Sequence, residues 1–162
     1  MARALLRLPH MPQTILVQDY MTATPHSIGV SLSLSDAANM MKAYKIRHLP
    51  VLDGNQLVGI VSDRDIQMVN SMAGVKADDV PIEEAMSQSP YTVASTTPLE
   101  VCARHMAKHK LGSAVVVNAN NKVVGVFTVT DGMNALADLL GKAPEGALPP
   151  PEKKKAPARK RA

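Results

Sequence analysis

Cysteine and aromatic residues are scarce in this sequence. Its 162 residues include one Cys, one Phe and no Trp. The lone Cys102 cannot form an internal disulfide, which excludes a disulfide-stapled secreted scaffold and favours a reducing compartment, so we predict a cytoplasmic protein. With so few rings, the core has to be aliphatic and rich in Met. For the same reason we do not expect an aromatic platform for single-stranded nucleic acid.

Long apolar runs are also missing. No stretch approaches the roughly 20 apolar residues that span a bilayer, so we expect no membrane attachment. The first ten residues are interrupted by Arg3, Arg7 and Pro9 and are too short for the core of a signal peptide. We expect residues 1–16 to be a loosely held N-terminal segment, and a short organellar presequence is the alternative.

Positive charge is concentrated at one end of the chain. The net charge is +4, but the segment from Lys142 onward holds seven Lys and Arg and two Glu, a net of +5, so the body carries +4 minus +5, or about −1. Residues 141–162 have a composition that cannot build a core and are predicted to be a disordered basic tail. This tail could tether a nucleic acid or an acidic partner, or could act only as a solvated, solubilising segment.

The chain repeats itself. The first half aligns with the second at an offset of 65 residues, and one inserted residue near Asn120 raises the offset to 66. The insertion falls between two apolar runs, where a turn tolerates a change in length. Repetition at this period predicts two copies of one small fold. The aligned pairs include Met21 and Met86, Pro25 and Pro90, Leu34 and Leu99, Lys45 and Lys110, Gly59 and Gly125, Ser62 and Thr128, and Asp65 and Asp131.

Each copy has the same pattern of elements. Apolar residues at helical spacing predict a helix starting at Leu34 and another at Leu99, with Cys102 in the core and a capping box from Thr97 to Glu100. Apolar runs at 48–52 and 56–61, and at 113–117 and 122–128, predict two hairpins. Second helices are expected near Asp63 and near Asp131, the latter ending at Gly141. Short strands are expected near Thr24 and Thr92.

These elements predict an α/β (α+β) fold of two βαββα repeats, at 17–75 and 80–140. A unit this small cannot cover its own sheet, so we expect the repeats to pack as a pseudo-two-fold pair through their sheet faces.

The pattern resembles the CBS domain, named for cystathionine β-synthase, in the tandem form called a Bateman module. The resemblance covers about residues 17–140. In the first copy it rests on the segments Asp19–Thr22, Leu34–Ala38, Ile46–Val51 and Gly59–Asp65, and in the second on Glu84–Ser87 and Gly125–Asp131. The second copy lacks the Arg-His-Leu-Pro of the first, because its hairpin begins Leu-Gly-Ser-Ala-Val.

The resemblance implies two clefts that receive AMP, ADP, ATP or another adenosyl ligand such as S-adenosylmethionine. In Ser62-x-x-Asp65 the acid can accept hydrogen bonds from ribose hydroxyls while the hydroxyl donates to phosphate or ribose, each charge-assisted bond contributing about 1.5–3 kcal/mol. Arg64 can add a bidentate phosphate contact. The alternative is that Ser62 and Asp65 only cap a helix.

Thr128 and Asp131 repeat this pair in the second copy. There Thr130 replaces Arg64 and Gly112 replaces Arg47, so we expect the second site to bind phosphate more weakly or to stay empty. Gly59 and Gly125 suit close approach of a ligand to the backbone. Candidates to contact the base are Thr24, His48 and Pro50 in the first copy and Thr92 and Ser113 in the second.

Two rival classes of function have less support. The sequence has no Gly-rich phosphate loop, nucleophile elbow or paired-Cys motif, so we predict that it is not an enzyme and requires no cofactor. His105 and His109 have the i, i+4 spacing of metal ligands, but no clear third ligand follows, and the neighbouring Lys108 and Lys110 would repel a cation. A solvent-facing pair is the favoured interpretation.

We therefore predict a regulator that binds an adenine nucleotide and signals to an effector protein. Because no effector domain is recognisable here, that partner is expected to be another chain, still unidentified. We also expect a homodimer, formed through a helix face that contains Met133, Leu136 and Leu140, unless that face packs within the chain.

Overall fold

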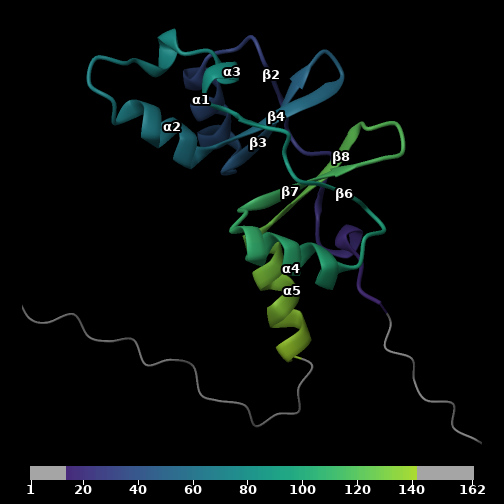
Figure 1. Cartoon of the computed structure of the whole chain (residues 1–162). Helices are drawn as coiled ribbons and strands as arrows, with labels where there is room; N and C mark the ends of the chain where they lie inside the picture. The colour runs from purple at the N-terminus through teal and green to yellow at the C-terminus, as the bar shows by residue number, and fades with distance from the viewer. Residues whose placement is uncertain (1–13, 142–162) are drawn as a thin grey trace, which may run out of the picture.

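Helices and strands follow one another in nearly the same order in the two halves of the chain (Figure 1). The computed structural model describes residues 14–141, so the predictions for the far N-terminus and for the basic tail from residue 142 lie outside the described residues. The first half contains β1 (Thr22–Ala23), β2 (Ile28–Gly29), α1 (Leu34–Tyr44), β3 (His48–Asp53), β4 (Gln56–Ser62) and α2 (Asp63–Asn70). The second contains β5 (Ser87–Gln88), β6 (Thr92–Ala94), α4 (Leu99–His109), β7 (Ser113–Val117), β8 (Val123–Thr128) and α5 (Val129–Gly141). The 3-10 turns η1 (Val17–Asp19) and η2 (Ala77–Asp79) and the short helix α3 (Ile82–Ala85) complete the order.

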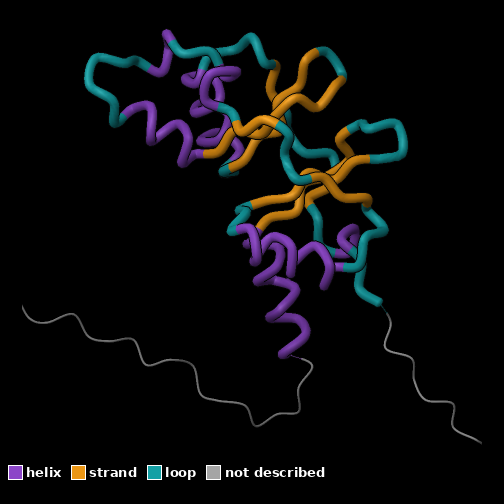
Figure 2. The backbone as a smooth tube through the Cα atoms, in the orientation of Figure 1, coloured by secondary structure: helices purple, strands orange, loops and turns teal. Residues whose placement is uncertain are grey.

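The predicted fold of two α/β repeats is confirmed. Two four-stranded sheets face each other, with α1, α2 and α3 on the outer side of one and α4 and α5 on the outer side of the other (Figures 1 and 2). Both predicted hairpins are present, as β3 with β4 and β7 with β8. β3, β7 and β8 each contain consecutive buried residues, as expected for strands covered on both faces, which is why short apolar runs in the sequence located them.

The two repeats exchange edge strands. The sheet orders are β2-β3-β4-β5 and β1-β8-β7-β6, so the first short strand of each repeat belongs to the sheet of the other. β1 is antiparallel to β8, with Thr22 opposite Val126, and β5 is antiparallel to β4, with Ser87 opposite Ile60. The expected strand near Thr92 is β6, but Thr24 lies between β1 and β2 with a left-handed φ of 46°.

Each sheet has its own aliphatic core. Leu34, Leu49 and Ile82 are fully buried in one core, and Val17, Cys102 and Phe127 are almost fully buried in the other. Val17, at the start of the first repeat, packs in the core of the second sheet, and Ile82, near the start of the second repeat, packs in the core of the first, in step with the exchanged strands. Cys102 is a core residue as predicted, and burial raises the pKa of its thiol.

Two glycines receive methionine side chains where the strands cross. A Cβ on Gly59 would overlap the Met86 sulfur, and a Cβ on Gly125 would overlap the Met21 sulfur. These glycines were expected to admit a ligand, and that interpretation is wrong. A thioether from the exchanged segment fills each space, because only Gly leaves room for it.

The helix starts differ in how they are capped. The Ser33 hydroxyl accepts a hydrogen bond from the Asp36 amide, and the Asp36 carboxylate accepts one from the Ser33 amide. These two reciprocal hydrogen bonds form a capping box at the start of α1. The capping box predicted for α4 is absent, because Pro98 is its N-cap residue and Glu100 pairs with Arg104 at 2.8 Å instead. α2 begins at Asp63 as predicted, whereas α5 begins at Val129, two residues before the expected start. No helix between residues 14 and 141 combines the length and hydropathy of a membrane span.

Candidate ligand-binding site

A cavity of about 1180 Å³ opens between the two repeats. Its wall is formed by the ends of β4 and β8, the starts of α2 and α5, and the segments that follow α1 and α4. Both repeats therefore contribute to one continuous space. The predicted site residues that line it are Thr24, His48, Ser62, Arg64, Thr128 and Asp131.

The two hydroxyl and acid pairs have the same geometry. Ser62 ends β4, and its amide and hydroxyl donate to Oδ2 of Asp65 at 2.8 and 2.7 Å. Thr128 ends β8, and its amide and hydroxyl donate to Oδ2 of Asp131, both at 2.7 Å. Both acids thus take part in helix caps, as the alternative interpretation proposed. All of these hydrogen bonds go to Oδ2, so Oδ1 of each carboxylate is left to accept a hydrogen bond from a ligand.

Four predicted residues are not on the cavity wall. Asp65 is half-buried beside it, and Pro50 is fully buried in the core of the first sheet. Thr92 is exposed on β6, and Ser113 lies on β7 opposite Thr128. Thr24 lies on the wall next to the second repeat, because its amide donates to the Val124 carbonyl at 3.0 Å. The exchanged strand carries Thr24 to this position.

Side chains of the first repeat occupy the positions where the second repeat lacks cations. Arg47 donates to the Thr130 hydroxyl at 3.4 Å. A Cβ on Gly112 would come within 3.0 Å of Nε2 of His48, so a larger residue there would displace the imidazole. Gly112 and Thr130 therefore make room for His48 and Arg47 across the pseudo-two-fold.

His48 is held in its neutral form. Burial lowers the pKa of its imidazole, and the nearby Arg47 guanidinium lowers it further, while the Asp65 carboxylate partly opposes them. A neutral imidazole can donate from one nitrogen and accept at the other, which suits recognition of a polar base or ribose.

Cations outnumber carboxylates on the cavity wall. The basic residues that line it are Lys45, Arg47, Arg64 and Lys110, and the acidic residues are Asp63 and Asp131. Lys45, Lys110, His26 and Gln67 line the cavity but were not chosen from the sequence. The alignment of Lys45 with Lys110 in the sequence repeat is the one observation that could have indicated these two lysines as site residues.

Comparison with known proteins identifies the family. The family described as CBS domain matches residues 17–69 and 82–138, more than half of the chain. This chain belongs to the CBS-domain family. The two matches correspond to the two repeats, so the chain is a CBS pair.

Relatives of this CBS pair include an enzyme and CBS pairs of solved structure. It is 37% identical over 113 residues to a homoserine O-acetyltransferase of Methanocorpusculum labreanum, covering 69% of this chain but only 22% of that protein. Among solved structures, the CBS pair of protein MJ0100 in complex with 5′-methylthioadenosine and S-adenosyl-L-methionine is 28% identical, with a TM-score of 0.69, and the match covers 75% of this chain and 99% of that one. The structure of CBSX2 from Arabidopsis thaliana in complex with AMP is 29% identical, with a TM-score of 0.64. The match covers 76% of this chain and 97% of that one.

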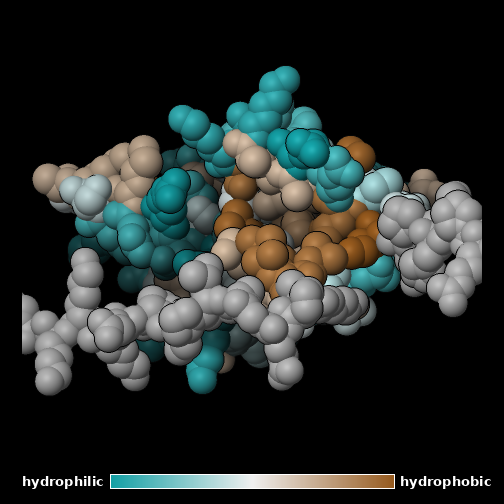
Figure 3. Space-filling view, turned by 90° about the horizontal axis from the view of Figure 1, so that it is seen from below, coloured by the Kyte–Doolittle hydropathy of each residue, from teal (hydrophilic) through white to brown (hydrophobic). Residues whose placement is uncertain are grey.

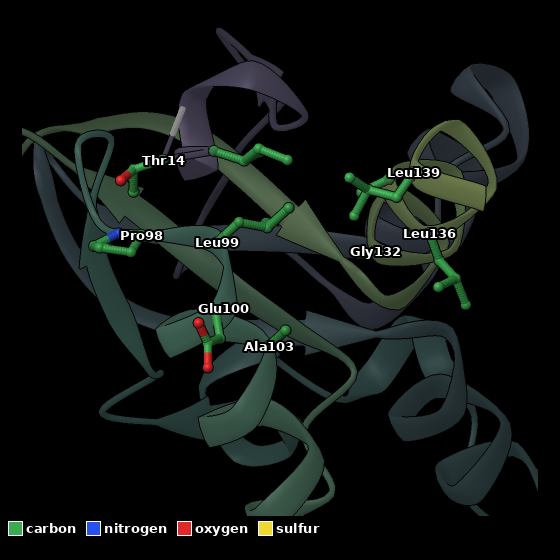
Figure 4. Close-up of a pocket in the computed structure, with 10 residues that line it drawn as sticks. Thr14, Pro98, Leu99, Glu100, Ala103, Gly132, Leu136 and Leu139 are labelled. Atoms are coloured by element: carbon green, nitrogen blue, oxygen red, sulfur yellow. The ribbon is translucent and has the colours of Figure 1, made fainter. Parts of the chain in front are cut away.

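A second cavity of about 450 Å³ lies between α4 and α5 of the CBS pair (Figure 4). Leu99, Leu136 and Leu139 line it, and Glu100 is its only charged residue. Viewed from below Figure 1, the molecule shows a hydrophobic area on its surface (Figure 3). The cavity between α4 and α5 lacks the clustered polar groups that a nucleotide requires. The larger cavity between the repeats is therefore the candidate site.

The histidine pair on α4 is part of an aromatic stack. The Tyr91 ring stacks on His105 at 4.0 Å between centroids, and His105 lies 4.3 Å from His109. Among residues 14–141 no group of three or more His, Cys, Asp or Glu side chains is placed to hold a metal ion.

Proposed function

We propose that this CBS pair binds an adenine nucleotide or another adenosyl ligand in the cavity between its repeats, and that it acts as a regulatory module in the cytoplasm rather than as an enzyme. The observation that carries the proposal is the single cavity onto which Ser62, Thr128 and Asp131 converge beside several cations. The ligands of the related CBS pairs, which are AMP, S-adenosylmethionine and 5′-methylthioadenosine, support the adenosyl class.

The wall residues have complementary roles toward such a ligand. Oδ1 of Asp131 can accept from a ribose hydroxyl, and Arg64 can donate to a phosphate. His48 and the apolar parts of the wall can contact the base. These interactions bind and orient a ligand and require no chemical step.

Calorimetric titration of AMP, ATP and S-adenosylmethionine tests the assignment. Replacing Asp131 with Ala should weaken the best ligand by about tenfold to a hundredfold, since a charge-assisted hydrogen bond contributes about 1.5–3 kcal/mol. Asp65→Ala should weaken it as well, because Asp65 fixes Ser62 on the wall. Asp53→Ala, an exposed acid in the first hairpin, is the control. If both site variants fold and bind the ligand with unchanged affinity, the assignment of the binding site to this cavity is wrong.

We further propose that the ligand changes the shape or association of the pair and that a separate effector chain recognises the change. A homodimer is proposed to form through α5, where Met133, Leu136 and Leu140 are 58%, 45% and 63% exposed rather than packed within the chain. A self-complementary apolar face of this kind suits a two-fold interface. Light scattering of Leu136→Lys and Leu140→Lys should give the monomer mass, and a monomeric parent chain would reject the dimer.

A polyanion tether is the second candidate function. It is favoured by the net charge of +5 from Lys142 onward, against about −1 for the rest of the chain. Truncation after Gly141 should abolish salt-sensitive binding to a nucleic acid. Binding that survives this truncation would show that the tail is not responsible.

A further inference from the structure

Two lysines at equivalent positions of the repeats line the cavity in a strained backbone conformation. Lys45 ends α1 with φ 55° and ψ 40°, and Lys110 ends α4 with φ 56° and ψ 36°. Gly is the usual residue at this left-handed position, because a Cβ there costs free energy. A positive charge near the end of a helix recovers part of that cost. The helix end alone does not explain why both lysines face one cavity.

Within residues 14–141 neither lysine forms an ion pair. Between residues 14 and 141 the only ion pair is Glu100 with Arg104, so no carboxylate lies within 4.0 Å of either lysine ammonium. Both side chains are exposed at the cavity wall, where Arg47 and Arg64 also lie. Cations gathered without partners in a concave site raise the local concentration of anions.

We propose that Lys45 and Lys110 hold the phosphate chain of the bound nucleotide from the two repeats, and that they select ADP or ATP over adenosyl ligands that lack phosphate. This inference rests on the proposed adenosyl function of the same cavity. Each added phosphate charge gains attraction from both lysines, whereas 5′-methylthioadenosine is uncharged and S-adenosylmethionine carries a cationic sulfonium that the same lysines repel. The second repeat thus contributes to phosphate binding through Lys110 although it lacks counterparts of Arg47 and Arg64.

The test measures binding and stability in the same variants. In Lys45→Gly and Lys110→Gly, ATP affinity should fall about tenfold or more in each, while adenosine affinity stays within about twofold, because only the phosphates lose a partner. The midpoint of thermal unfolding should not fall, because Gly relieves the left-handed strain. The salt dependence of ATP binding should also become shallower.

Matched controls separate charge from backbone effects. Asn121→Gly relieves the same strain at φ 57° in the turn between β7 and β8, away from the cavity, and should leave ATP affinity unchanged. Lys122→Ala removes an exposed charge from the same turn and should also leave it unchanged.

The failures of the inference and of the proposed function are distinguishable. If the parent chain binds adenosine and S-adenosylmethionine at least as tightly as ATP, the phosphate selection is wrong and the adenosyl site stands. Equal losses of ATP and adenosine in the lysine variants would assign the lysines a structural role and overturn the inference. If no adenosine compound binds the parent chain, the proposed function falls and this inference falls with it.

Discussion

The protonation of His48, which lies on the cavity wall, affects the stability of the fold. It lies at the start of β3 and packs against Gly112 of the other repeat. The charged groups that act on it are Arg47, from the segment before β3, and Asp65, from α2. Because burial dominates, the folded protein binds the His48 proton less readily than the unfolded chain does.

Stability should therefore fall on mild acidification. The unfolded His48 has a pKa of about 6.5 and the folded one lies below it, so between these values the unfolded chain binds more protons and the free energy of unfolding decreases as pH falls. Urea unfolding at pH 7.5 and at pH 5.5 measures the difference. His48→Gln should flatten it, whereas His109→Gln on the exposed side of α4 should not. A difference unaffected by His48→Gln would show that other groups control the pH dependence.

The glycines at the strand crossings should be intolerant of a single methyl group. Gly125→Ala places a Cβ against Met21 and should destabilise the fold by about 1–3 kcal/mol, the usual cost of overpacking. Gly29→Ala is the control, because a Cβ there meets no atom within 4 Å. In a double-mutant cycle by denaturant unfolding, Met21→Ala should recover part of the loss. Additive effects would mean that the two residues do not interact.

At the scale of elements, α1 and α4 are equivalent helices with unequal starts. α1 has a reciprocal cap between Ser33 and Asp36, whereas Pro98 occupies the aligned N-cap position of α4 and offers no side-chain acceptor. The Asp36 carboxylate also accepts hydrogen bonds that lower its pKa. The repeats therefore use different residues for the same helix.

Ser33→Ala should cost about 1 kcal/mol of unfolding free energy, since it leaves an N-terminal amide of α1 without a partner. Thr97→Ala, at the position where the sequence predicted a cap for α4, should cost less, because the Thr97 side chain makes no capping hydrogen bond. Urea denaturation of the two variants side by side measures this difference. Equal losses would contradict the assignment of the caps.

At the scale of the whole molecule, the boundaries of the two folded units differ from the boundaries of the two sequence repeats, because the repeats exchange edge strands. The first sheet and its core use residues 28–88 without interruption, whereas the second combines β1 and Val17 with residues from 91 onward. A fragment that ends at residue 75 loses Ile82, Met86 and β5 from its core.

We therefore expect fragment 24–90 to fold, and fragment 17–75, cut at the sequence repeat, to be largely unfolded. Fragment 80–140 should also fail to fold, because it lacks the β1 segment. Circular dichroism and amide exchange of the three fragments measure this. A folded 17–75 fragment would show that the exchanged segment is dispensable.

Much of the candidate site was predictable from the repeated motif. Ser62 and Thr128 are the last residues of β4 and β8, and Arg64 and Asp131 lie in the first turn of the helices that follow, so the motif placed all four at the strand-to-helix junctions that line the cavity. Pro50 could not be excluded in advance, because strand alternation alone does not say which face of the sheet meets the other repeat. Lys45 and Lys110 were visible as an aligned pair, but their orientation depends on a backbone conformation that Lys rarely adopts.

The sequence by itself determined the repeat, the hairpins and most helix starts, because each depends on hydrogen bonds and apolar periodicity within a few turns of chain. Only the tertiary structure decided the strand exchange, since two-residue strands carry no periodic signal and Thr22 pairs with Val126, about a hundred residues away. That exchange brings Met21 onto Gly125 and Thr24 onto the cavity wall. The tertiary structure also has one continuous cavity where two clefts were expected, because residues at the ends of β4 and β8 line the same space.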